Sequence, residues 1–135
     1  MTLIEAKDRR KSRAGNIALW VLQVVAAAWF LIAAAGKFAG AEPAASTFEA
    51  IGWGDWFRTL IGALEVAGAV ALFVPVLAGL AGMAFAGLMA GAVVTEAFVS
   101  GGSVVMPLAL LVVSAIIAWG RRDSIVRLWA LVTRR

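Results

Sequence analysis

The chain contains no cysteine and no histidine among its 135 residues. Without cysteine there can be no disulfide, thiolate nucleophile, CxxC redox pair or thiolate metal site. Without histidine there can be no bis-histidine haem ligation and no acid–base catalysis by imidazole. We therefore expect no metal site and no intrinsic cofactor, so that any electron carrier has to come from a substrate or a partner protein.

Charged residues are also scarce. They make up 15% of the chain, whereas 63% of the residues are hydrophobic and the mean hydropathy is +0.95. The hydrophobic content and the mean hydropathy lie far above those of soluble globular proteins, and the charged fraction lies below theirs. The net charge is +4, but the basic residues flank apolar runs instead of covering one soluble face. We therefore predict the lipid bilayer as the environment and no nucleic-acid partner.

The long apolar runs predict membrane-spanning helices. The run from Ala14 to Gly36 carries no charge and is long enough for one span. From Thr59 to Thr95 the only charged residue is Glu65. As one helix this second run would be about 55 Å long, whereas a hydrocarbon core is about 30 Å thick. It therefore has to fold back, and Pro75 places the turn.

We accordingly predict the second span at 57–74 and the third at 76–98. The fourth lies in the charge-free run 97–120, after a Ser-Gly-Gly-Ser loop, and becomes helical between Ser103 and Pro107. An alternative interpretation treats the first run as a secretory signal, because residues 39–41 (Ala-Gly-Ala) resemble a cleavage site. The run is too long for an ordinary signal core, which favours a span.

Two flanking segments have a different character. Between the first two spans, Pro43 is predicted to open a short interfacial helix that is followed by two tryptophans, Trp53 and Trp56. After residue 120, we predict a basic amphipathic helix over 121–135, with Asp123 or Ser124 as its cap and apolar side chains on one face, namely Ile125, Leu128, Trp129 and Val132. The alternative for this last segment is a frayed basic tail.

The charge distribution predicts the topology. The tail 1–15 has five basic and two acidic residues, and the segment 121–135 has five basic and one acidic residue. The segment 37–58 has two basic and three acidic residues. The positive-inside rule then places both termini in the cytoplasm, which requires an even number of crossings. We predict an all-α fold, a four-helix transmembrane bundle over 16–120, in a bacterial cytoplasmic membrane.

Small residues recur at helical spacing along the second and third spans. Because lipid is as apolar as leucine, helices in a membrane associate through close packing of small residues and through buried polar contacts. We predict that five glycines serve this packing: Gly62, Gly68, Gly82, Gly87 and Gly91.

Glu65 is the most informative polar residue, because an ionised carboxylate at mid-membrane costs about 2.5 to 3.5 kcal/mol. Gly62, Gly68 and Ala69 surround it at helical spacing, so it should face another helix or a narrow cavity. Two interpretations stay open. In one, a protonated Glu65 hydrogen-bonds across the bundle and specifies packing. In the other, it exchanges protons or binds a ligand.

Four further residues are candidates for ligand binding or proton handling. Lys37 either extends to the headgroups or pairs with Glu65, and such a pair would suit a quinone carbonyl or an anionic head group. Glu96 is either a solvated end charge or part of an outward-opening cleft with Lys37 and Arg58. Arg58 is otherwise expected to meet lipid phosphate. Trp29 lies mid-span, where it either packs or lines a pocket.

Several short motifs, in this order and spacing, resemble the DoxX-like family of small four-span bacterial membrane proteins. They lie at the end of the first span, around Glu65, in the third span and along the fourth, at Ala35–Phe38, Ile61–Gly68, Met89–Glu96, Met106–Leu108 and Ala118–Arg121. The resemblance covers about residues 17–122. Many members have His after the Thr of the third span, where this chain has Glu96. Any role of that imidazole is therefore in doubt here.

The resemblance implies a membrane accessory role more than a defined reaction, because relatives are linked to membrane redox or oxidative-stress assemblies. We therefore expect a non-catalytic accessory or scaffold subunit with a membrane protein partner or a homo-oligomeric state. One alternative is a quinone-interacting oxidoreductase subunit that uses Glu65 and Lys37. Another is a small transporter or lipophile-binding protein.

Overall fold

The computed structural model describes residues 3–42 and 44–133, and for residues 4–12 it describes the backbone alone. The described residues form six α-helices and one short π-helix: α1 (Leu3–Ala39), α2 (Ala44–Ile51), α3 (Asp55–Leu72), α4 (Ala78–Thr95), η1 (Glu96–Ser100), α5 (Val105–Gly120) and α6 (Arg122–Thr133). No strand occurs in this part of the chain. The predicted all-α fold class is confirmed.

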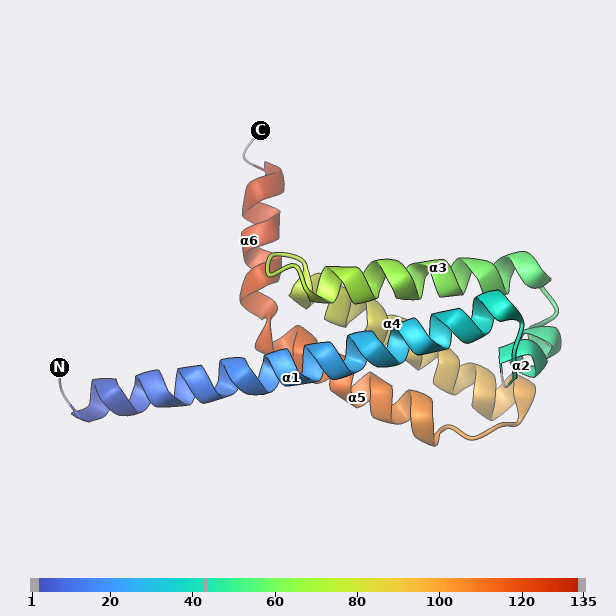
Figure 1. Cartoon of the computed structure of the whole chain (residues 1–135), viewed down its shortest axis with the longest axis horizontal. Helices are drawn as coiled ribbons and strands as arrows, with labels where there is room; N and C mark the ends of the chain where they lie inside the picture. Colours follow the sequence, from blue (N-terminus) through green and yellow to red (C-terminus); the bar gives the residue numbers. More distant parts are fainter. Residues whose placement is uncertain (1–2, 43, 134–135) are drawn as a thin grey trace.

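Four long helices, α1, α3, α4 and α5, run alongside one another as a bundle (Figure 1). Helix α1 packs mainly on α3, and α4 packs mainly on α5. The α1 helix has 37 residues, about 55 Å at 1.5 Å per residue. Because this length exceeds the bundle, its N-terminal part projects beyond the other helices (Figure 1). From Leu3 on, the predicted basic tail is therefore a helical extension of the first span.

Judged by length and composition alone, two of the described helical segments could cross a membrane. They are Arg13–Ala39 of α1, and Ala78–Ser100 of α4 with η1. Helices α5 and α6 together would provide a third, but they are bent by 60° where they meet. Helix α3 has 18 residues, about 27 Å, and contains the charged residues Asp55, Arg58 and Glu65. Its place in the bundle therefore depends on how the neighbouring helices accommodate those charges.

The turns lie close to where the sequence predicts them. Helix α3 ends at Leu72 and α4 begins at Ala78, with Pro75 between them. Helix α5 begins at Val105, so that Pro107 falls in its first turn, where the missing N–H is not needed. The prediction that Pro43 opens α2 falls outside the described residues.

The core of the bundle consists of two stacked rings and small side chains around them. The rings of Phe30 on α1 and Phe85 on α4 lie parallel, with centroids 3.7 Å apart. Gly68 on α3 lies against the ring of Phe85, at a position where a Cβ would collide with it. Most other large apolar side chains are exposed on the outside of the bundle, as expected of a surface that faces lipid.

The prediction that Asp123 or Ser124 caps the last helix is wrong. Helix α6 begins one residue earlier, at Arg122, so both residues lie inside its first turn. The Ser124 hydroxyl instead accepts a hydrogen bond from the Gly79 N–H, at 2.9 Å, and donates one to the Arg121 carbonyl, at 2.7 Å. This link fixes the start of α6 to the start of α4.

Candidate site: a buried lysine–glutamate pair

Glu65 is buried inside the bundle, on the face of α3 that packs against α1. Its side chain is 1% exposed. One turn before it, Gly62 approaches the Phe38 ring and the Lys37 Cβ, and one turn after it, Gly68 lies against Phe85. Because larger residues would push α1 or α4 away at these positions, the two glycines allow the helices to close around the carboxylate.

The structure brings Lys37 and Glu65 together. The Lys37 Nζ lies 2.9 Å from the Glu65 Oε1, and the lysine side chain is 16% exposed. The contact is therefore an ion pair, whose attraction depends chiefly on distance. It offsets part of the cost of placing each charge away from water.

Arg58 lies next to this pair but has a structural role. Its Nε donates a hydrogen bond to the Lys37 carbonyl, at 2.8 Å, and its Nη1 lies 3.3 Å from the Asp55 Oδ1. The Lys37 carbonyl belongs to the last turn of α1, so Arg58 satisfies an acceptor at a helix C-terminus, where a cation is favourable. The expected contact of Arg58 with lipid phosphate stays a prediction beside these contacts within the chain.

Glu96 is held elsewhere. It is the first residue of η1, and its Oε1 accepts a hydrogen bond from the Thr47 hydroxyl of α2 at 3.2 Å. This contact connects the interfacial helix to the end of α4. Glu96 therefore contacts α2, and no interaction among the described residues joins it to the Lys37–Glu65 pair.

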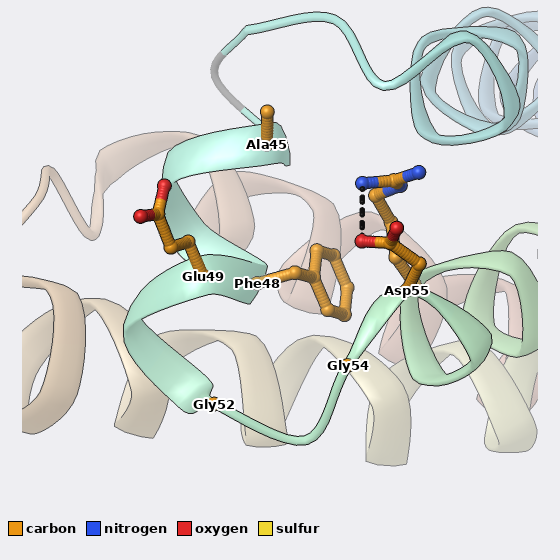
Figure 2. Close-up of a pocket in the computed structure, with 7 residues that line it drawn as sticks. Ala45, Phe48, Glu49, Gly52, Gly54 and Asp55 are labelled. Carbon is orange, nitrogen blue, oxygen red and sulfur yellow. Dashed lines mark hydrogen bonds and ion pairs between the residues drawn. The ribbon is translucent and has the colours of Figure 1, made fainter.

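The pocket in the structure differs from the cleft that the sequence predicts. A pocket of about 390 Å³ lies at this end of the bundle, between α2 and the start of α3 (Figure 2). Its lining residues are Ala45, Phe48, Glu49, Gly52, Gly54, Asp55 and Arg58. Of the residues predicted to form the cleft, only Arg58 lines this pocket. The loop between the helices bends at Gly52 and Gly54, both at positive φ, where glycine is favoured.

Trp29 and three of the five predicted packing glycines do not contribute to this site. Trp29 is 40% exposed on the outer face of α1, next to the buried Phe30, so it does not line a pocket here. Gly82 packs against α5, with the Ala118 backbone N 2.7 Å from where a Cβ would be. At Gly87 and Gly91, a Cβ would have no atom of the described residues within 4 Å, so both glycines face away from the bundle. Their predicted packing role is therefore wrong within this chain.

Sequence reasoning missed a second polar cluster, at the opposite end of the bundle. The Arg121 Nε donates a hydrogen bond to the Gln23 Oε1, at 2.7 Å, and its Nη1 donates one to the Asn16 Oδ1, at 2.8 Å. Gln23, which is fully buried, in turn donates to the Leu72 carbonyl at the end of α3. Asn16, Trp20 and Gln23 share one face of α1, at i, i+4 and i+7, and this spacing was the available signal.

Comparison with known proteins gives one match. A model of the family described as DoxX-like matches residues 21–117, which contain the Lys37–Glu65 pair and most of the bundle. Neither the comparison with curated proteins nor the comparison with solved structures gives a match.

Proposed function

This chain belongs to the DoxX-like family, and from that premise we propose that it is a non-catalytic accessory or scaffold subunit of a membrane complex. The resemblance to redox-associated relatives suggests a redox complex as its context. The basic ends of the chain support a bacterial cytoplasmic membrane with both termini in the cytoplasm.

The observation that carries this proposal is the closed environment of Glu65. A carboxylate that exchanges protons with a substrate has to be reached by that substrate or by water. Glu65 is 1% exposed, its counter-charge is supplied by Lys37, and close helix contacts flank it at Gly62 and Gly68. These features suit a side chain that packs between α1 and α3, and not one that a substrate reaches.

The outer face of α4 supports assembly with another transmembrane helix, either from a partner subunit or from a second copy. Gly87 and Gly91 are spaced as in a small-xxx-small motif, and nothing in the described part of the chain covers them. In a membrane such a motif lets a second helix approach closely. The exposed stripe thus suits a protein that acts by holding partners together.

The test is purification of the tagged protein from its native membrane in mild detergent, followed by identification of co-purifying proteins. For a scaffold, Glu65→Gln leaves partner recovery and cellular function close to wild type, since glutamine keeps the shape and Lys37 can extend to the headgroups. Gly87→Leu reduces partner recovery because it fills the approach face. Loss of cellular function in Glu65→Gln with full partner recovery would contradict the proposal.

A second candidate function, a quinone-interacting subunit, is favoured by one observation. Lys37 lies in the last turn of α1 and keeps 16% exposure, so its ammonium group is within reach of a polar head group from the outer side. This function predicts that quinone co-purifies and that Glu65→Gln loses activity while assembly persists. A transporter would instead give substrate flux in liposomes that hold this protein alone.

A further inference from the structure

The bundle consists of two pairs of helices, and each pair packs more extensively within itself than against the other pair. Helix α1 packs mainly on α3, with the Lys37–Glu65 ion pair and the hydrogen bond from Arg58 to the Lys37 carbonyl between them. Helix α4 packs mainly on α5, where Gly82 lies against the Ala118 backbone. We call these pairs the α1–α3 unit and the α4–α5 unit.

The end of the bundle next to the start of α6, here called the α6 end, joins the two units firmly. The turn from α3 to α4, which contains Pro75, lies there and connects the units through the chain (Figure 1). The Arg121 Nε of α5 donates a hydrogen bond to the Gln23 Oε1 of α1, at 2.7 Å. Gln23 is fully buried and donates in turn to the Leu72 carbonyl of α3, also at 2.7 Å. Because these hydrogen bonds are short, and one of them is charge-assisted, they form a fixed joint.

The opposite end, where α2 and η1 lie, is here called the α2 end, and there the α4–α5 unit is poorly buried. The last buried residue of α4 is Met89, and the first of α5 is Ser114. Every residue from 90 to 113 is exposed or half-buried, and α2 likewise contains no buried residue. On the α1–α3 unit, by contrast, burial continues to Ala34 and Gly62 near this end. Segments with few buried contacts open at the lowest free energy.

A hydrogen bond crosses between the units at the α2 end. Helix α2 belongs to the α1–α3 unit, because the chain connects it to both helices and the Phe48 ring contacts the Phe57 ring of α3 edge-on. The Thr47 hydroxyl of α2 donates to the Glu96 Oε1 of η1, at 3.2 Å, and both residues are half-buried. Separation of the units at this end has to break this hydrogen bond.

We propose that the two units separate at the α2 end, turning about the joint at the α6 end, and that the Thr47–Glu96 hydrogen bond holds them closed. This motion gives the bundle a second, open conformation. The walls that it uncovers are apolar, since Met89 of α4 belongs to the same buried cluster as Phe30 of α1. Lipid replaces this contact at low cost, because it is as apolar as the side chains. The buried ion pair lies within the α1–α3 unit and therefore stays shielded.

The experiment measures distances between α3 and α5 at both ends of the bundle. Because the chain has no cysteine, spin labels can be placed at chosen cysteines of the full-length protein in liposomes, for double electron–electron resonance. Leu60→Cys with Leu108→Cys reports on the α2 end. Val70→Cys with Ile116→Cys reports on the α6 end, and the four native side chains are all exposed. We expect one narrow distance distribution at the α6 end, and at the α2 end an additional longer distance with a population of up to about 10%.

Variants of Glu96 test the hydrogen bond. Glu96→Leu removes the acceptor of the Thr47 hydroxyl, and we expect the population of the longer distance to rise about fivefold, the effect of one lost hydrogen bond. Glu96→Gln is the matched control, because its side-chain carbonyl still accepts from Thr47, and it should change this population by less than about twofold. Neither variant should alter the distribution at the α6 end.

Three outcomes would overturn the proposal. A single narrow distribution at both ends, in wild type and in Glu96→Leu alike, would show that the units do not separate. Equal broadening at both ends would show a general loosening without a joint. If Glu96→Gln acts as strongly as Glu96→Leu, the hydrogen bond does not hold the units closed. Should Glu96→Leu fail to fold, Thr47→Val removes the donor from the other side and decides the same question.

Discussion

At the scale of residues, Lys37 and Glu65 each reduce the cost of burying the other's charge. A charge near mid-membrane costs about 2.5 to 3.5 kcal/mol, and the opposite charge at 2.9 Å offsets part of that cost for both partners. Desolvation of the two groups remains, so a buried pair contributes little compared with two apolar residues of similar size. Removal of one partner is different, because it leaves an uncompensated charge among apolar side chains.

We therefore expect Lys37→Met to change the protonation of Glu65. With the ammonium removed, the neutral acid is cheaper to bury than the carboxylate. Infrared spectroscopy of the protein in lipid should then show a protonated carboxyl band that the wild type lacks, and the additional substitution Glu65→Gln should remove it. An unmoved carboxyl band in Lys37→Met would show that the two groups are not coupled.

The same pair can be tested by a double-mutant cycle for stability. We expect Lys37→Met to lower the free energy of unfolding by about 2 to 3 kcal/mol. Removing one partner of a buried ion pair usually costs about 3 to 5 kcal/mol, and the loss here is at or below that range because Glu65 can take up a proton. Lys37→Met with Glu65→Met should lie within about 1 kcal/mol of wild type, since no charge is left behind. Unfolding in mixed detergent micelles measures both. Additive effects of the two substitutions would exclude a coupled pair.

At the scale of elements, α4 shows two different uses of small residues. On its inner face, Ala81, Gly82 and Phe85 are buried against the neighbouring helices. On its outer face, a Cβ at Gly87 or Gly91 would meet no atom of the described residues within 4 Å. Small residues recur at similar spacing on both faces, because on either face they let a neighbouring helix approach closely. Only the inner face is filled by this chain.

Alanine at Gly82 and at Gly87 should therefore act in opposite directions. A Cβ at Gly82 would lie 2.7 Å from the Ala118 backbone N, so Gly82→Ala has to separate α4 from α5, and we expect a loss of about 1 to 3 kcal/mol. Gly87→Ala meets no atom and gains helix propensity, so the isolated subunit should be unchanged or stabilised by up to about 1 kcal/mol. Thermal unfolding of the two variants side by side checks this, and equal destabilisation would contradict it.

At the scale of the whole molecule, the two ends of the bundle differ in character. The N-terminal extension of α1 and the start of α6 lie at one end, whereas α2 and η1 lie at the other (Figure 1). The first end carries most of the arginines, and the second carries Glu42, Glu49 and Asp55. This asymmetry agrees with an even number of crossings and with the positive-inside rule.

The absence of native cysteine makes this orientation testable by labelling. We expect Ala50→Cys, on α2, to react with a membrane-impermeant maleimide in intact cells. Thr133→Cys, at the end of α6, should react only after the membrane is permeabilised. Both positions are exposed, so a difference between them reports on the side of the membrane and not on burial. Labelling of both residues from the same side of the membrane would overturn the predicted topology.

By itself, the sequence determined the helical fold, the approximate span boundaries and the importance of Glu65, because hydropathy and charge act over short stretches of chain. Tertiary structure decided which polar groups meet. It joined Lys37 to Glu65, turned Arg58 to the end of α1, moved Glu96 to α2 and gathered Arg121, Gln23 and Asn16 at the other end. It also left Gly87 and Gly91 uncovered. The physical reason is that a one-dimensional pattern gives the face of a helix on which a residue lies, whereas the rotation and tilt of the packed neighbours decide what that face touches.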